Sequence, residues 1–240
     1  MEHTTLTLDT ADGPMHAYRA APEGTRRLPA LLVLQEAFGV NHHIKNVCQR
    51  LAEHGYIALA PELFHRTGHG VELGYTDMSQ VMPHFSRLTN DGIAMDVAAG
   101  LAALRADPHV DESRIGVIGF CVGGFATFLA AERTDAAAFV AFYGGGVLRA
   151  RPGIALEPLI EDADKIRRPI LLVFGGQDQS IPAEDVKAIG DRLTSLGKAH
   201  TIVTLPEGGH GFACDDRAAY HQPSSDEAWQ ITHDWLAKTL

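Results

Sequence analysis

The chain has 240 residues, of which 45% are hydrophobic and 21% charged, a composition typical of a soluble globular protein. Its formal net charge of −10 argues against nucleic acids and anionic membrane surfaces as partners, because both would repel it. No change in composition divides the chain. We therefore expect a single domain over residues 1–240, large enough to bury a substantial core.

The N-terminal residues lack the basic and apolar regions of a secretory signal, and no apolar run is long enough to span a bilayer. We therefore expect a cytoplasmic protein. The three cysteines, Cys48, Cys121 and Cys214, are odd in number and widely spaced, which is not the pattern of a disulfide framework. A reducing compartment would also keep a reactive thiol available.

The predicted elements begin with a hairpin, whose strands over 5–8 and 15–20 flank the turn signal Asp12-Gly13. Buried strands then alternate with helices, which predicts a mostly parallel sheet covered on both faces. We expect strands over 29–34, 56–60, 115–120, 136–142, 169–174 and 201–205, and helices over 42–54, 90–106, 183–196 and 226–238, with one more helix directly after the 115–120 strand. The pattern is weak over 62–89, where glycines and Pro83 interrupt it. Such irregular segments above a parallel sheet often line an active site.

The most informative stretch is Gly119-Phe120-Cys121-Val122-Gly123, which joins a predicted strand to a predicted helix. It is a G-x-C-x-G sequence, with cysteine where the nucleophile elbow G-x-S-x-G has serine. In such an elbow the apex side chain projects from a sharp turn, and the adjacent helix N-terminus stabilises a thiolate. The alternative is a glycine-rich turn that packs a buried cysteine.

Three more chemically capable residues follow predicted strands: Glu36, Asp178 and His210. The carboxyl ends of parallel strands share one edge, where ligands bind in α/β folds. The order Cys121, Asp178, His210 is also the nucleophile, acid, histidine order of the α/β-hydrolases. We therefore expect these residues to converge there, with three aromatic residues as candidates for the substrate pocket: Phe38, Tyr143 and Phe212.

The motifs Gln35-Glu36-Ala37-Phe38-Gly39, Gly119-Phe120-Cys121-Val122-Gly123-Gly124 and Gly209-His210-Gly211-Phe212 resemble those of the dienelactone hydrolase family, a cysteine branch of the α/β-hydrolase fold. The weaker motif Gly175-Gly176-Gln177-Asp178 is correctly placed. The resemblance spans nearly the whole chain.

The resemblance implies an α/β-hydrolase fold and a Cys121-His210-Asp178 triad, with Glu36 holding the resting thiol until substrate binds. It implies backbone N–H groups of Val122 and Ala37 as the oxyanion hole. The implied reaction is hydrolysis of a small-molecule ester or lactone through a thioester, without a metal or organic cofactor. We expect a monomer or small homo-oligomer.

The sequence departs from the family at the arginines that bind the carboxylate of dienelactone. Cys214 stands at the position shortly after His210, with Arg217 farther on, and Arg66 or Arg87 in the earlier segment has no clear registration. We therefore expect neutral esters to be turned over better than lactones that bear a carboxylate.

Two other classes of function remain open for the same fold. A catalytically silent binding protein would keep the pocket without turnover, and a redox-sensing protein would oxidise Cys121 reversibly without forming an acyl-enzyme. Four histidines, His42, His43, His65 and His69, lack the carboxylates and spacing of a metal site, so we interpret them as loop or surface residues and expect no metal.

Overall fold

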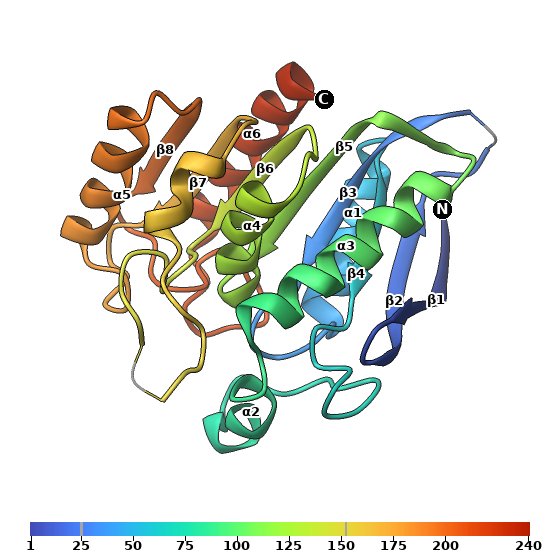
Figure 1. Cartoon of the computed structure of the whole chain (residues 1–240), viewed down its shortest axis with the longest axis horizontal. Helices are drawn as coiled ribbons and strands as arrows, with labels where there is room; N and C mark the ends of the chain where they lie inside the picture. The colour runs from blue at the N-terminus through green and yellow to red at the C-terminus, as the bar shows by residue number, and fades with distance from the viewer. Residues whose placement is uncertain (25, 152) are drawn as a thin grey trace.

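The computed structural model describes residues 1–24, 26–151 and 153–240. Eight strands form one sheet in the order β1-β2-β4-β3-β5-β6-β7-β8 (Figure 1). The strands are β1 (Glu2–Thr10), β2 (Gly13–Ala21), β3 (Leu28–Leu34), β4 (Ile57–Pro61), β5 (Val110–Phe120), β6 (Ala138–Phe142), β7 (Ile170–Gly175) and β8 (His200–Leu205). The predicted strands are therefore all present, and β5 begins earlier than expected.

The sheet is antiparallel only at the edge that holds the N-terminal hairpin. Strand β1 pairs with β2 and β2 pairs with β4 in antiparallel fashion, and every later pairing is parallel. Every residue of β4, β6 and β7 is buried, because helices cover both faces of the parallel part. The near-continuous apolar runs of these strands follow from that double burial.

Helices α3, α4 and α5 cover one face of the sheet, and α1 and α6 cover the other (Figure 1). The helices are α1 (His42–Glu53), α2 (Met78–Phe85), α3 (Asn90–Ala106), α4 (Val122–Arg133), α5 (Ala183–Ser195) and α6 (Gln222–Thr239), with a short 3₁₀ helix η1 (Ile160–Lys165). Helix α6 begins one turn before its predicted start, with a proline in its first turn, a position that proline favours. Along the part of the chain that the structure describes, no helix is long and apolar enough to cross a membrane.

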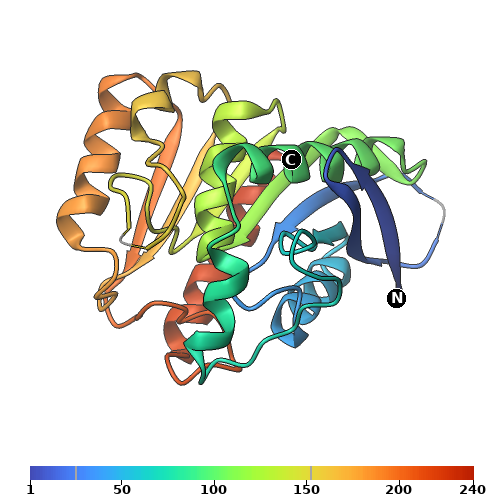
Figure 2. The same ribbon diagram turned by 60° about the horizontal axis from the view of Figure 1, so that its bottom comes forward.

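The segment 62–89 was expected to be irregular, and the structure corrects this at α2. Asp77 caps the helix by accepting a hydrogen bond from the Ser79 N–H. Val81 and Phe85 are buried, whereas Met78 and Met82 are exposed. Figure 2 shows α2 beside the segment that precedes α6, above the carboxyl ends of the parallel strands. The helix thus lies over the edge where ligands bind in α/β folds.

Candidate active site

Cys121 stands at the turn between β5 and α4 with strained backbone angles, φ 56° and ψ −114°. Glycines make the turn possible. A Cβ atom at Gly119 would lie 2.1 Å from the Gly123 carbonyl oxygen, and one at Gly123 would lie 2.2 Å from the Leu34 carbonyl oxygen. Such strain persists only where the surrounding structure enforces it, and it is common at functional sites. The turn has the geometry of a nucleophile elbow.

The structure brings together three of the side chains expected to converge at this edge. His210 Nε2 lies 3.2 Å from Cys121 Sγ, and His210 Nδ1 lies 2.7 Å from Asp178 Oδ2. Asp178 follows β7 and His210 follows β8, so both loops end at the same edge as the elbow. The series is arranged as a nucleophile, a base and an orienting acid would be.

Ser180 was not identified from the sequence, yet it contacts two members of this series. Asp178 Oδ1 accepts hydrogen bonds from Ser180 N at 2.8 Å and from Ser180 Oγ at 2.6 Å. Ser180 Oγ also lies 3.2 Å from His210 Nδ1. Aspartate followed two residues later by serine is a signal for this type of turn, and it could have identified Ser180. The serine fixes the orientation of the carboxylate.

Electrostatics favour the charged forms of the cysteine and the histidine. Burial opposes ionisation of Cys121, but the charge and hydrogen bond of His210 outweigh it and lower the pKa of the thiol. Burial likewise opposes protonation of His210, but the adjoining thiolate and Asp178 raise the pKa of the imidazole. Their coupled titration therefore favours a thiolate next to an imidazolium.

Glu36 has a different partner from the one implied by the resemblance. Its Oε1 accepts a hydrogen bond from Arg217 Nη1 at 3.2 Å, and its side chain is only 1% exposed. Among the residues that the structure describes, no hydrogen bond joins Glu36 to Cys121, whose thiol contacts His210 instead. The negative charge of Glu36 acts in the opposite direction to His210 and offsets part of the lowering of the Cys121 pKa. The carboxylate thus opposes thiolate formation from nearby without a direct contact.

The sequence has Cys214 at the position shortly after His210 and Arg217 farther on, but the structure brings Arg217 to the same cavity as His210. Two successive turns, with hydrogen bonds from Cys214 N to Gly211 O and from Arg217 N to Cys214 O, fold the chain back. The guanidinium of Arg217 then lies 5.4 Å from the ring centroid of Phe38, at the cavity next to Cys121 and His210. Tertiary folding, rather than spacing along the chain, places this arginine.

The cavity beside Cys121 has a volume of about 230 Å³. Apolar side chains from α2 and from the loop after β6 form much of its wall, and two arginines reach it. Its lining residues are Ala37, Phe38, Met78, Val81, Met82, Phe85, Cys121, Arg151, Ile154, Ser180, His210 and Arg217. Helix α2 and Arg151 were not identified from the sequence, although the apolar spacing over 78–85 is helical.

Of the three aromatic candidates, Phe38 lines this cavity and the other two do not. Tyr143 and Phe212 are fully buried, and their ring centroids lie 5.5 Å apart. The Tyr143 ring also lies 5.4 Å from that of His210. Tyr143 therefore packs against the imidazole of His210, Phe212 packs against Tyr143, and neither ring lines the cavity.

The two candidate oxyanion-hole donors lie beside the thiol. Val122 is the first residue of α4, so its N–H has no acceptor within the helix. Val122 and Ala37 each line a cavity that also contains Cys121. Ala37 lies in the loop after β3 and Val122 at the start of α4. Gly123 allows the two segments to approach closely, because a Cβ there would lie 2.2 Å from the Leu34 carbonyl oxygen.

The other predicted polar residues lie outside this cavity. Cys48 and Cys214 are buried, and Cys214 Sγ contacts Tyr75 Oη at 3.4 Å. His43 contacts Asp215, and His65 contacts the buried Asp96. Both of these histidines are themselves buried, which differs from the surface position we expected.

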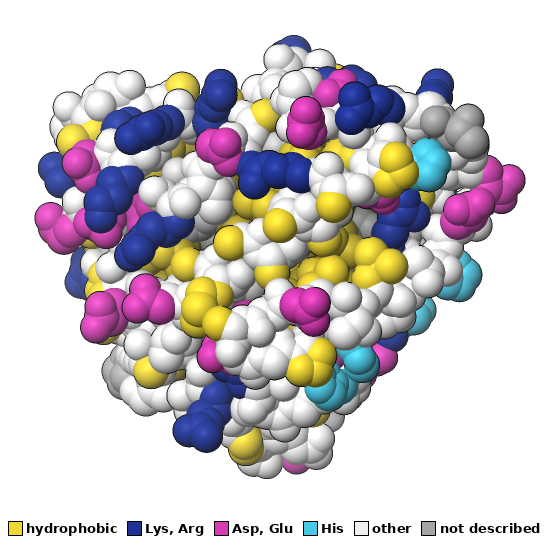
Figure 3. Space-filling view, turned by 45° about the vertical axis from the view of Figure 1, so that its right-hand side comes forward, with side chains coloured by type: hydrophobic (Ala, Val, Ile, Leu, Met, Phe, Trp, Pro, Cys, Tyr) yellow, Lys and Arg dark blue, Asp and Glu magenta, His cyan; other side chains and the backbone are white. Residues whose placement is uncertain are grey.

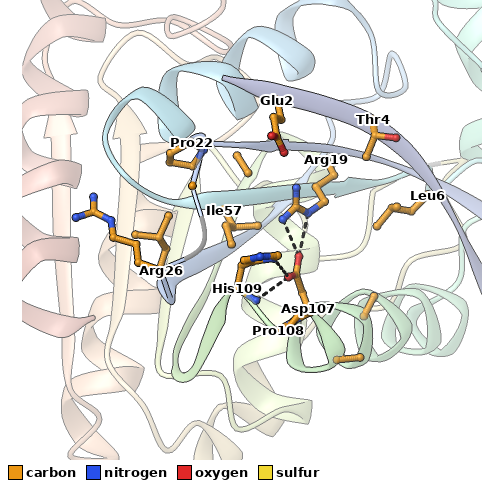
Figure 4. A pocket seen from close by; sticks show the side chains of 15 residues that line it. Glu2, Thr4, Leu6, Arg19, Pro22, Arg26, Ile57, Asp107, Pro108 and His109 are labelled. Carbon is orange, nitrogen blue, oxygen red and sulfur yellow. Dashed lines mark hydrogen bonds and ion pairs between the residues drawn. The ribbon is translucent and has the colours of Figure 1, made fainter.

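A larger cavity of about 550 Å³ lies at the opposite end of the parallel strands, beside the first residues of β3 and β4. Figure 4 shows Arg19 and Asp107 pointing toward each other there, with Arg19 Nη2 2.7 Å from Asp107 Oδ2. The face of the molecule in Figure 3 carries a central band of hydrophobic side chains bordered by interspersed acidic and basic ones. None of the described residues that line the cavity of about 550 Å³ is a cysteine or a serine.

The mostly parallel eight-stranded sheet, with the elbow at its centre, has the α/β-hydrolase fold. Residues 15–240 match the model of the "Dienelactone hydrolase family". The chain belongs to this family, as the sequence motifs predicted, and it is a hydrolase of the dienelactone hydrolase type.

Curated relatives and a solved structure agree with this assignment. A Synechocystis protein named "Putative carboxymethylenebutenolidase" is 36% identical over 229 residues, covering 95% of this chain and 93% of that protein. A Methylorubrum extorquens protein of the same name is 37% identical, with 94% and 77% covered. The crystal structure titled "Putative Dienelactone Hydrolase" from Klebsiella pneumoniae superposes with a TM-score of 0.89 at 32% identity, covering 98% of each chain.

Proposed function

We propose that this protein hydrolyses carboxylic esters or lactones through a thioester on Cys121, with His210 and Asp178 completing a catalytic triad. The observation that supports this most strongly is the hydrogen-bonded series from Cys121 Sγ through His210 to Asp178, at 3.2 Å and 2.7 Å. The series opens onto a cavity with apolar walls. A nucleophile, its base and an orienting acid are the parts that acyl transfer requires.

In the first half of the proposed reaction, the Cys121 thiolate attacks the carbonyl carbon and forms a C–S bond. The carbonyl oxygen becomes an oxyanion, which the N–H groups of Val122 and Ala37 stabilise by hydrogen bonding. The C–O bond to the leaving alkoxide then breaks, and His210 gives that oxygen its proton. The product of this half is a thioester, and for a lactone the alcohol stays attached to the acyl chain.

In the second half, a water molecule attacks the thioester while His210 accepts its proton. The C–S bond breaks, the acid leaves, and the thiolate and imidazolium are restored. Asp178 stabilises the imidazolium in both halves. The negative charge of Glu36 opposes the lowering of the Cys121 pKa by His210 and so offsets part of it.

The arginines at the cavity support a substrate class different from the one expected from the sequence. Arg151 and Arg217 both line it, and Glu36 is the carboxylate that neutralises one of them. Among the described residues, the side chain of Arg151 donates to one backbone carbonyl, that of Ser180, at 2.9 Å. We therefore propose that lactones bearing a carboxylate are accepted, since Arg151 lines the cavity and can donate charge-assisted hydrogen bonds to a substrate carboxylate.

The mechanism is tested by comparing Cys121→Ala with the matched variant Cys214→Ala in an aryl ester and lactone assay. Turnover should be lost in the first variant and kept in the second, and mass spectrometry should detect an acyl adduct on Cys121 in wild type. Full turnover in Cys121→Ala would refute the mechanism. Reversible peroxide oxidation of Cys121 without any acyl adduct would favour the redox-sensing alternative, and binding without turnover would favour the silent one.

The substrate class is tested with a carboxylate-bearing lactone and its methyl ester. In Arg151→Met, we expect KM for the carboxylate-bearing lactone to rise about tenfold, the equivalent of one charge-assisted hydrogen bond, and KM for the methyl ester to stay unchanged. An equal effect on both substrates would leave the hydrolase mechanism intact but remove the proposed role of Arg151.

A further inference from the structure

Three potential metal ligands meet on the surface formed by β2 and the loop that follows β4. His16 lies on β2, Glu62 directly follows β4, and His69 lies farther along the same loop. One ligand atom from each side chain lies within 4.8 Å of the other two. From the sequence, His69 was interpreted as a loop or surface residue. The sequence did not indicate the cluster, because His16 and Glu62 come close to His69 only through the pairing of β2 with β4.

Backbone and side-chain hydrogen bonds hold the three residues in place. The Glu62 N–H donates to the His16 carbonyl at 2.9 Å, which continues the antiparallel pairing of β2 with β4. Glu62 Oε2 accepts from the Gly70 N–H at 3.0 Å, which closes the loop over 62–70 and orients the carboxylate. The rings of His16 and His69 lie side by side, with their centroids 4.5 Å apart. The arrangement therefore brings two imidazoles to an oriented carboxylate.

We propose that His16, Glu62 and His69 bind a divalent transition-metal ion of the Zn²⁺ type. Two imidazoles and one carboxylate form a donor set that zinc and its neighbours accept, and a fourth position remains for water. Bonds of about 2.1 Å in a tetrahedral site separate the ligand atoms by about 3.4 Å. The ligand atoms lie within 4.8 Å of one another, and rotation of the exposed His69 side chain can bring its ring nitrogen to the shorter separation. Mg²⁺ and Ca²⁺ prefer sites made wholly of oxygen ligands and should bind poorly.

A metal here would act as a structural clamp. It would tie the loop over 62–70 to β2, and the same loop continues into the contact with the candidate oxyanion loop. There Gly39 pairs with Glu72, and the Leu73 N–H donates to the Phe38 carbonyl at 2.9 Å. Ala37, a candidate oxyanion donor, immediately precedes Phe38. The proposed site is distinct from the cavity at Cys121, none of whose lining residues it shares.

The test measures Zn²⁺ binding to the full-length chain by competition with a chromophoric chelator. It uses the Cys121→Ala background, which removes the thiol next to His210 as a competing ligand. We expect one ion per chain in the parent. Binding should weaken at least about tenfold in His69→Ala and in Glu62→Gln, since loss of a ligand should cost no less than loss of its supporting contacts. His69 is exposed, so its substitution should leave the fold intact.

The matched control is His233→Ala, which disrupts a second histidine pair. The rings of His54 and His233 lie 4.0 Å apart, and this pair is outside the proposed ligand set. Affinity should be unchanged in this variant, and Zn²⁺ but not Mg²⁺ should raise the melting temperature of the parent. The proposal is overturned if the parent binds no Zn²⁺, if His69→Ala binds as tightly as the parent, or if His233→Ala abolishes binding.

Discussion

Arg217 Nη1 donates a hydrogen bond to Glu36 Oε1 at 3.2 Å, which joins the loop after β8 to the loop after β3. The Glu36 side chain is 1% exposed, and that of Arg217 is 18% exposed. In the described part of the structure, Glu36 Oε2 has no hydrogen-bond partner. This buried carboxylate is therefore paired with a single arginine among the described residues.

We expect Arg217→Met to destabilise the protein by about 3 kcal/mol, because removal of one partner leaves a buried charge uncompensated. The double variant Glu36→Gln/Arg217→Met should recover much of that loss, since it removes the charge as well. Denaturant unfolding of the wild type, both single variants and the double variant measures the coupling. Simple additivity of the two single losses would contradict the pairing.

Asp178→Asn should lower kcat by about 10⁴-fold if the carboxylate stabilises the His210 imidazolium, by analogy with the loss of this group in serine hydrolases. The substitution should also lower the pKa of His210, since Asp178 raises it. Steady-state kinetics and an NMR titration of the imidazole measure the two effects. An unchanged kcat would exclude the proposed role of Asp178.

Ser180→Ala should have a smaller effect of the same kind. It removes the 2.6 Å hydrogen bond to Asp178 Oδ1 but leaves the backbone N–H that binds the same oxygen. We expect kcat to fall about tenfold, the equivalent of one hydrogen bond to a charged group, with KM unchanged. Because a positioning role acts through the acid, Ser180→Ala should have little further effect in an Asp178→Asn background.

Alkylation of Cys121 should begin at a lower pH than alkylation of a free cysteine, whose pKa is about 8.5. The direction follows because the positive charge of His210 favours the thiolate, and the thiolate is the reactive form. In His210→Ala, the midpoint of the rate against pH should therefore rise. A midpoint that stays the same would contradict the ion pair.

The other two cysteines provide an internal control in the same experiment. Burial raises the pKa of Cys48 far above its usual value and that of Cys214 to about 12. Neither thiol should react in the folded protein. Peptide mapping after alkylation should find the label on Cys121 alone.

Gly123→Ala should destabilise the protein by about 3 kcal/mol and abolish activity, because the new Cβ would lie 2.2 Å from the Leu34 backbone oxygen. Gly74→Ala is the matched control, since no heavy atom lies within 4 Å of its added Cβ and its φ is not in the left-handed region. Thermal unfolding and ester turnover should separate the two variants. Equal stability of both would show that the elbow can relax.

The sequence was sufficient for the fold and for most of the candidate site because both depend on local patterns. Continuous apolar runs identified the buried strands, and the glycines of the elbow indicated a turn that larger residues cannot form. The strand-end positions of Cys121, Asp178 and His210 predicted that they would meet, since parallel strands bring their carboxyl ends to one edge. Their catalytic roles stay a prediction until turnover is measured.

The sequence was less informative over 62–89, where glycines and Pro83 interrupt the pattern that would have predicted α2. Helix α2 has apolar residues at 78, 81, 82 and 85, a helical spacing, and Asp77 caps it. The nearby glycines and the internal Pro83 led us to expect an irregular segment. Packing of Val81 and Phe85 overrides those local signals, because burial of an apolar face stabilises a short helix more than propensity does.

By itself, therefore, the sequence determined the α/β-hydrolase fold, the family, and the convergence of the cysteine, acid and histidine, each through spacing along the chain. Only the tertiary structure decided which partner holds Glu36, that Arg217 reaches the cavity, and that His16 and Glu62 lie beside His69. Those contacts join residues far apart in the chain. No local pattern determines them, because they depend on how turns and strand pairings place whole segments in space.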